Sequence, residues 1–180
     1  ARARMDSVEL FPFQRAIEAG MGAVMTAHIS VPSLDGGAGE PATLSSAVLT
    51  DLLREEMSFD GLLFTDAMDM SAISRRHSPE EASVRAIEAG ADVILMPPSV
   101  ERAVEGIVAA VESGRIDVSR IDASVRRILE TKKQMGLDVA REVQIDRIGE
   151  VVGVPAHTEV AAEIAERSIT LLHNSRNLLP

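Results

Sequence analysis

The sequence predicts an α/β fold in which short buried strands alternate with helices. The segment Arg-Ala-Ile-Glu-Ala-Gly occurs twice, at residues 15–20 and 85–90, and each copy is followed by an apolar run of strand length. These runs are apolar throughout, which is typical of parallel strands covered on both faces. A third such run, at residues 62–65, ends in two carboxylates, Asp66 and Asp69. Since the carboxyl ends of parallel strands carry the chemistry in barrels of strands and helices, this segment is the first candidate for a functional site.

The first half of the chain contains two helix-to-strand units. Gly20 tolerates the left-handed conformation that ends a helix, and the apolar residues 23–27 after it predict a strand. The next helix is expected near residues 46–57, where leucine and methionine recur on one face, and it leads into the strand at residues 62–65. The two copies of the repeat therefore enclose two units of roughly 35 residues, the size of a strand–helix–strand step.

The second half begins with clear helix signals. Ser78 followed by Pro79 predicts the N-cap and first turn of a helix that ends at Gly90. A strand is expected after it at residues 93–96, and Ser99 can cap the next helix.

A further helix at residues 119–134 completes the regular pattern, and after it the sequence changes. The side chains of this helix expected to face the core are Ile121, Val125, Ile128 and Leu129. Residues 137–157 are charged, contain glycine and proline and show little periodicity, which predicts a linker. Residues 158–180 are expected to open a second α/β domain, with a helix followed by a short strand at residues 168–172.

The barrel-like pattern covers residues 1–136 and supplies three strands. A complete (β/α)₈ barrel takes ~250 residues and eight strands. We therefore expect the chain to be the carboxyl-terminal portion of a TIM-type barrel followed by an interdomain linker. Expressed alone, it is expected to be inactive and poorly ordered, because the barrel interior and a strand edge would be exposed.

Composition excludes several classes of function. The 180 residues are 46% hydrophobic and 26% charged, which is typical of a globular protein. The chain is long enough to form one domain with a hydrophobic core. A formal net charge of −10, without extended basic runs, argues against a nucleic-acid partner, and with Phe as the only aromatic, base-stacking surfaces are not expected. The absence of cysteine excludes disulfides, thiolate zinc sites and a cysteine nucleophile. No apolar run approaches the ~18 residues of a membrane span, so none is expected.

Several segments, in this order and spacing, resemble glycoside hydrolase family 3. They are Ala-Val-Met-Thr-Ala-His-Ile at residues 23–29, Val-Pro at 31–32, Pro-Ala-Thr-Leu-Ser at 41–45, Leu-Arg-Glu-Glu at 53–56, Phe-Asp-Gly at 59–61 and Phe-Thr-Asp-Ala-Met-Asp-Met at 64–70. Residues 165–174 and 178–180 are similar to the start of the family's second domain. The resemblance implies that the three strands are the sixth, seventh and eighth of the barrel.

The resemblance also implies a catalytic role for Asp66. In this family the aspartate after Thr or Ser in the seventh-strand motif is the nucleophile. A tryptophan commonly follows it in the β-glucosidase-like branch, whereas Ala67 and Met68 are similar to the β-N-acetylhexosaminidase branch. That branch takes its acid/base from a histidine in a Gly-His-Gly plus Asp-Ser-His loop and binds the sugar with a Lys-His pair, and none of these motifs occurs in this chain. On pattern alone, Asp66 could equally cap the following helix.

Three further side chains are candidates with an alternative each. His28, at the tip of its strand, could line the sugar pocket or be a satisfied structural histidine. Met68 could line the pocket, although methionine there is more often a core residue. Asp69 would share a helical face with Asp66 and could form a metal pair with it, but a solvated or capping carboxylate is the better reading, so no metal site is expected.

The resemblance therefore implies a retaining glycosidase that removes terminal β-linked N-acetylhexosamine, or a related β-glycoside, through a covalent intermediate on Asp66, with a carbohydrate substrate and no cofactor. A β-glucosidase of the same family is one alternative. A metal-assisted lyase that uses Asp66 and Asp69 is another, and a non-catalytic carbohydrate-binding remnant is the third.

Overall fold

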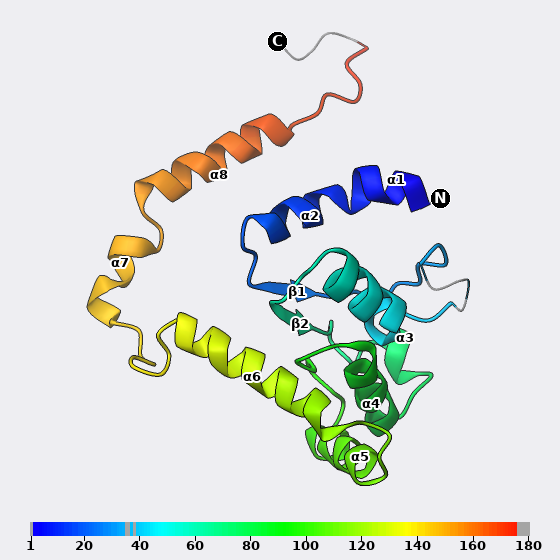
Figure 1. Ribbon diagram of the computed structural model, residues 1–180. Helices are drawn as coiled ribbons and strands as arrows, with labels where there is room; N and C mark the ends of the chain where they lie inside the picture. The colour runs from blue at the N-terminus through cyan, green and yellow to red at the C-terminus, as the bar shows by residue number, and fades with distance from the viewer. Residues whose placement is uncertain (1, 35–36, 38, 176–180) are drawn as a thin grey trace. The chain divides into compact units, whose positions relative to one another are not determined.

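The computed structural model describes residues 2–34, 37 and 39–175, which belong to two compact units, Ala1–Asp138 and Val139–Pro180 (Figure 1). The first unit contains both of the described strands and every candidate site residue, and the regular elements described in the second unit are helices. The predicted linker at residues 137–157 and the predicted second domain from residue 158 stay predictions. The family-like segment at residues 178–180 lies outside the described residues.

Two parallel strands and one bridged segment form the sheet of the first unit. β1 (Ala23–Met25) pairs with β2 (Leu62–Phe64) in the register Ala23 to Leu62, and Phe64 forms a parallel bridge to Val93. The strand predicted at residues 93–96 is therefore reduced to a single bridge. The reason is local, because the Leu95 N–H bonds to the Thr65 side chain and Met96 adopts a positive φ of 45°, so the backbone leaves the ladder.

Helices occupy most of the remaining described chain. They are α1 (Arg2–Arg4), η1 (Met5–Glu9), α2 (Phe11–Glu18), η2 (Ala42–Leu44), η3 (Ala47–Glu56), α3 (Ser71–Ser74), α4 (Pro79–Ala89), α5 (Val100–Glu112), α6 (Val118–Gln134), η4 (Ile145–Arg147), α7 (Ile148–Val151) and α8 (Pro155–Ser168). The predicted caps are present, since Ser78 accepts a hydrogen bond from the Glu81 N–H and Ser99 accepts one from the Arg102 N–H. Gly90 follows α4 with a φ of 128°, a conformation that favours glycine.

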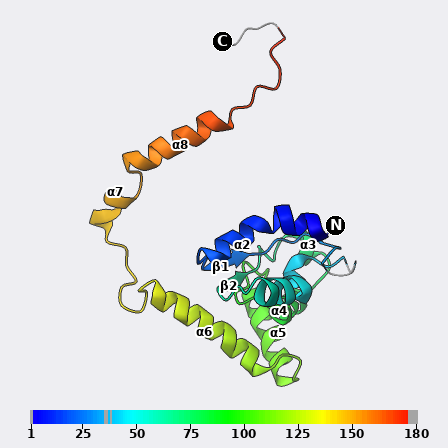
Figure 2. The ribbon, with the colours of Figure 1, turned by 45° about the horizontal axis from the view of Figure 1, so that its top comes forward.

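The core of the first unit lies between the sheet and the helices that follow each strand. Its largest fully buried side chains include Leu49, Phe59, Leu63 and Ile73. A smaller cluster joins α4 to α5, which lie side by side in both views (Figures 1 and 2). Gly106 permits this approach, because a Cβ there would lie 2.7 Å from the Cβ of Glu80.

Two sequence expectations are wrong, one about a buried helix face and one about a strand. In α6 the buried residue is Ser124, whereas Val125 and Leu129 are 46% and 59% exposed. The predicted strand at residues 168–172 is absent, because α8 continues to Ser168 and the following residues form no ladder in the described part of the chain.

Apolar side chains are exposed around β1. Met25 is 56% and Ile29 is 60% exposed, and an apolar groove of about 200 Å³ runs along η1, α2 and β1. Among the described residues, β1 pairs only with β2, so its other edge carries no strand. Of the helices described, none has the length and apolar character needed to cross a membrane.

Candidate active site

The candidate site lies where the sheet segments end. Because β1 and β2 are parallel and Phe64 bridges to Val93 in the same sense, the residues that follow all three segments leave one edge of the sheet. His28 follows β1 and Asp66 follows β2, so two sequence-predicted site residues reach the same edge. The shared edge is the carboxyl end, where barrel folds place their chemistry.

Thr65 fixes the backbone that leads into Asp66. Its side chain is fully buried, and its hydroxyl accepts a hydrogen bond of 2.8 Å from the Leu95 N–H. Its own N–H donates to the Val93 carbonyl oxygen at 3.0 Å. The position of Asp66 is therefore set by the neighbouring segment as well as by its own strand.

The Asp66 carboxylate is half-buried and sparsely bonded. Its Oδ1 accepts a 2.7 Å hydrogen bond from the Ala67 N–H, the only hydrogen bond of this side chain among the described residues. Asp66 does not cap the next helix, because the N-cap of α3 is Met70. One carboxylate oxygen is thus available to a ligand or a reacting carbon.

His28 is half-buried and both of its ring nitrogens are engaged. Nδ1 lies 2.8 Å from the Thr43 hydroxyl, and Nε2 lies 2.9 Å from the carbonyl oxygen of Ala67. Thr43 reaches the ring because an antiparallel bridge between Ser30 and Pro41 brings its segment alongside the one that follows β1. A direct contact of His28 with sugar stays a prediction, and the geometry connects it to the residue after Asp66.

Met68 and Asp69 lie on the turn that follows Asp66. The Met68 side chain is 1% exposed and belongs to the core, which was the alternative considered from the sequence, so its contact with substrate stays a prediction. Asp69 is exposed. The expectation that Asp69 shares a helical face with Asp66 is wrong, because residues 67–70 form a turn. A hydrogen bond from the Met70 N–H to the Ala67 carbonyl oxygen closes this turn.

No metal site emerges around these carboxylates. Within residues 2–34, 37 and 39–175, there is no group of three or more His, Asp or Glu side chains that could hold an ion. The metal-assisted alternative therefore gains no ligand beyond the two aspartates that the sequence already offered.

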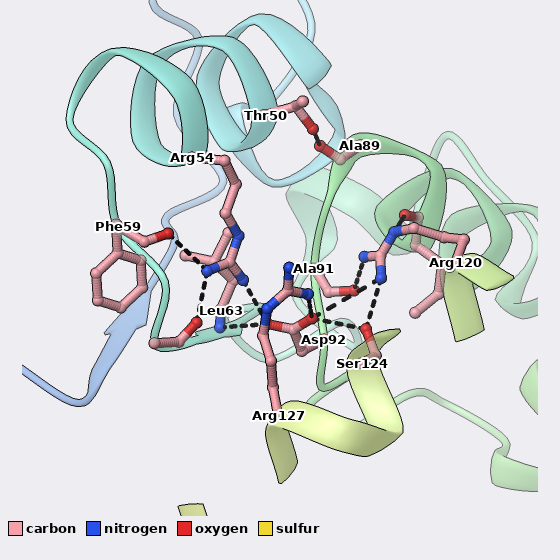
Figure 3. A network of polar contacts seen from close by, with 12 residues as sticks. Thr50, Arg54, Phe59, Leu63, Ala89, Ala91, Asp92, Arg120, Ser124 and Arg127 are labelled. Carbon is pink, nitrogen blue, oxygen red and sulfur yellow. Dashed lines mark hydrogen bonds and ion pairs between the residues drawn. The ribbon is translucent and has the colours of Figure 1, made fainter. Parts of the chain in front are cut away.

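A second carboxylate, Asp92, lies at the start of the bridged segment and is fully buried (Figure 3). Its Oδ2 accepts from Arg54 at 2.5 Å and from the Leu63 N–H at 3.0 Å. Its Oδ1 accepts from Ser124 at 2.6 Å and from Arg127 at 3.0 Å. We call these five residues the Asp92 cluster, which joins η3, β2 and α6.

Three arginines, Arg54, Arg120 and Arg127, surround the single carboxylate of Asp92. Arg120 lies 3.8 Å from the carboxylate and donates to the Ser124 hydroxyl and to the Ala91 carbonyl oxygen (Figure 3). Burial lowers the pKa of Arg54 and of Arg120 below the usual arginine value, and the Asp92 charge acts against this shift. The carboxylate is therefore needed to keep these buried cations compensated.

Thr43, Thr65 and Asp92 were not identified as site or support residues from the sequence. Each is a polar side chain inside an apolar run or motif, and each is fully or almost fully buried. Isolated buried polar residues require partners, which is the signal that could have marked them. Their partners lie 15 to 38 residues away, so the sequence does not show which ones they are.

Comparison with known proteins identifies relatives over nearly the whole chain. The family described as "Glycosyl hydrolase family 3 N terminal domain" matches residues 1–131. Beta-hexosaminidase A of Pseudoalteromonas piscicida is 31% identical over 96% of this chain and 32% of its own length. Beta-N-acetylglucosaminidase/beta-glucosidase of Cellulomonas fimi is 30% identical over 93% of this chain and 31% of its own length.

A solved structure supports the same relationship. The glycoside hydrolase family 3 beta-N-acetylglucosaminidase from Paenibacillus sp. str. FPU-7 is 43% identical, with a TM-score of 0.83 over 97% of this chain and 33% of that protein. The chain thus spans about a third of the length of these relatives. The matched domain has a TIM-barrel-type α/β fold, as the sequence motifs implied. This chain belongs to glycoside hydrolase family 3.

Proposed function

We propose that the chain forms the carboxyl-terminal part of the (β/α)₈ barrel of a retaining glycosidase, with Asp66 as its nucleophile. The observation that carries the proposal is the place of Asp66 at the carboxyl end of β2, with one carboxylate oxygen unengaged by the described residues. Since the chain spans about a third of its relatives, the remaining strands and the acid/base are assigned to a longer polypeptide. In this proposal β1, β2 and the bridged segment at Val93 correspond to the sixth, seventh and eighth strands of the barrel.

The proposed reaction proceeds in two displacements. The Asp66 carboxylate attacks the anomeric carbon of the sugar, and the bond from that carbon to the leaving oxygen breaks as the external acid protonates this oxygen. Water, deprotonated by the same external group, then attacks the anomeric carbon and releases Asp66. Within this chain, the required features are an ionised carboxylate and a rigid backbone that aims it.

The proposed substrate is a terminal β-linked N-acetylhexosamine. Two named relatives, the hexosaminidase of P. piscicida and the acetylglucosaminidase of Paenibacillus, support this sugar class. A β-glucosidase is the second candidate, because the C. fimi relative carries both activities in its name. Ala67 directly after Asp66, where the β-glucosidase-like branch commonly has tryptophan, favours the first candidate, and substrate assays decide between the two.

The test uses the full-length enzyme with two chromogenic substrates, an aryl β-N-acetylglucosaminide and the matching aryl β-glucoside. The proposal predicts turnover of the first with a higher kcat/KM than the second. Faster turnover of the glucoside would select the second candidate. Sugar binding without hydrolysis of either substrate, unchanged by substitution of Asp66, would reject the enzymatic proposal in favour of a binding remnant.

The isolated 180-residue chain provides a separate check of the partial-barrel proposal. It should show no hydrolysis and should bind a hydrophobic dye, because Met25, Ile29 and the groove beside β1 would remain uncovered. A sharp cooperative melting transition together with hydrolysis of the acetylglucosaminide would contradict it. The full-length enzyme in the same dye assay is the control.

A further inference from the structure

Three side chains link the end of β1 to the residue directly after Asp66. The Thr26 and Thr43 hydroxyl oxygens are 2.8 Å apart, and Thr43 in turn lies 2.8 Å from Nδ1 of His28. Nε2 of His28 reaches the Ala67 carbonyl oxygen at 2.9 Å. Thr26 and Thr43 are buried, so solvent does not compete effectively for these contacts.

The chemistry of the partners assigns the protons for a neutral imidazole. A carbonyl oxygen only accepts hydrogen bonds, so Nε2 of His28 carries the hydrogen and donates it to Ala67. Nδ1 is then an acceptor, and the Thr43 hydroxyl donates to it. The Thr43 oxygen remains free to accept from Thr26. Every contact in the series has one donor and one acceptor.

The group held by His28 belongs to the turn that carries Asp66. The peptide between Ala67 and Met68 is bound on both sides, since its carbonyl oxygen accepts from His28 and its N–H donates to the Leu95 carbonyl oxygen at 2.9 Å. The preceding peptide N–H, that of Ala67, donates to the Asp66 carboxylate. The orientation of Asp66 therefore depends on a peptide that His28 helps to hold.

We propose that His28 is a positioning residue for the Asp66 nucleophile, acting through the Ala67 carbonyl instead of through a direct contact with sugar. Both of its ring nitrogens are occupied within the chain, so neither can bind a sugar hydroxyl without losing a protein contact. This inference rests on the proposed role of Asp66. It differs from the sugar-contacting role that was one of the two alternatives for His28 in the sequence analysis.

The test compares variants of the full-length enzyme by steady-state kinetics and by the rate at which a slow fluorinated substrate labels the nucleophile. His28→Ala should lower kcat and the labelling rate by about 100-fold, the cost of a small misplacement of a reacting group. KM should change by less than about threefold, because no ground-state sugar contact is lost. Thr43→Val should cause a smaller loss in the same direction, since it removes the donor to Nδ1 and keeps a similar volume.

Rescue separates positioning from simple loss of structure. His28→Gln retains an amide N–H that can reach the Ala67 carbonyl, and it should recover about tenfold or more of the kcat lost in His28→Ala. His157→Ala removes an exposed imidazole from the second unit and should leave both kinetic constants unchanged. Melting temperatures of all variants identify any that fail to fold. If His28→Ala does not fold, His28→Gln is compared with the unmodified enzyme instead.

The outcomes distinguish this inference from the proposed function. If the unmodified enzyme is labelled at Asp66 and His28→Ala is labelled equally fast, positioning is wrong and the proposed function stands. A rise in KM with unchanged kcat would instead assign His28 a sugar contact. Absence of rescue by glutamine in a folded protein would also overturn the inference. If the unmodified enzyme forms no adduct, both proposals fail.

Discussion

Asp66 and Asp92 lie on adjacent segments of one small sheet and have opposite surroundings. The Asp92 side chain is fully buried and accepts hydrogen bonds from a backbone N–H, a serine and two arginines. Asp66 is half-buried and accepts one hydrogen bond, from the next residue along the chain. Both are aspartates beside an apolar strand run, so residue type alone does not separate them.

The difference shows how one fold assigns two roles to one side chain. Asp92 uses both oxygens to connect η3, β2 and α6, which leaves no lone pair exposed to a reacting molecule and makes its contribution structural. Asp66 keeps one oxygen available, and its position is held by backbone contacts of its neighbours. The four predictions below test this separation in the full-length enzyme.

The largest effect is expected for Asp66→Asn. The amide cannot form the glycosyl ester, so turnover should fall by several orders of magnitude, on the order of 4 kcal/mol or more of transition-state stabilisation. The free energy of unfolding should change little, because this side chain makes one local hydrogen bond. Initial rates and urea denaturation measure the two effects. Asp69→Asn, an exposed neighbour, is the matched control and should retain most activity.

Asp92→Asn should show the reverse pattern. Neutralising the carboxylate leaves Arg54, Arg120 and Arg127 without compensation in a buried region, which should cost about 3 kcal/mol of unfolding free energy. Urea denaturation measures this loss, and kcat per folded molecule should stay within a few-fold of the unmodified enzyme. Loss of turnover in a variant of unchanged stability would mean that Asp92 takes part in the chemistry.

Ser124→Ala removes one donor from the Asp92 cluster and should have an intermediate effect. Its hydroxyl donates to Asp92 at 2.6 Å and accepts from Arg120 at 2.6 Å, and hydrogen bonds to charged groups contribute about 1.5–3 kcal/mol. We expect a loss near the lower end, about 1.5 kcal/mol, because Arg120 keeps its bond to the Ala91 carbonyl. An unchanged urea midpoint would show that the cluster does not need this hydroxyl.

The smallest effect is expected for Arg127→Gln. Arg127 is 32% exposed and is one of three arginines around a single carboxylate, and its charge also lowers the pKa of Arg54. The loss of its ion pair is partly offset by reduced repulsion, so the change should stay below about 1 kcal/mol. Arg126→Gln, at the exposed neighbouring position of α6, is the control. A loss of unfolding free energy as large as that of Asp92→Asn would show that Arg127 is the principal partner of the Asp92 carboxylate.

The local parts of the fold could be predicted from the sequence. Helix caps at Ser78 and Ser99, the glycine after α4, and the strand before Asp66 depend on neighbours within a few residues. The placement of Asp66 at a carboxyl strand end was predictable for the same reason. The sequence alone did not show that Asp66 is not a helix cap. The structure shows this, because α3 begins five residues later.

Features that depend on distant partners could not be predicted. The apolar stripe of α6 predicted that Val125 faces inward, but the buried residue is Ser124, whose hydroxyl bonds to Asp92 thirty-two residues away. The third strand was expected from its apolar residues, yet the Thr65 side chain takes the Leu95 N–H and the ladder ends. In both cases a polar contact between separate segments outweighs the hydrophobic pattern of one segment.

The measurement that tests the central claim most directly is the identification of the covalent intermediate. The full-length enzyme is incubated with a slow fluorinated N-acetylglucosaminide, digested, and its peptides are sequenced by mass spectrometry. The account predicts one glycosyl adduct, on the peptide that contains Asp66, with fragment ions that place it on that residue. An adduct on Asp69, Asp92 or any other residue, or full activity without an adduct in Asp66→Asn, would contradict it.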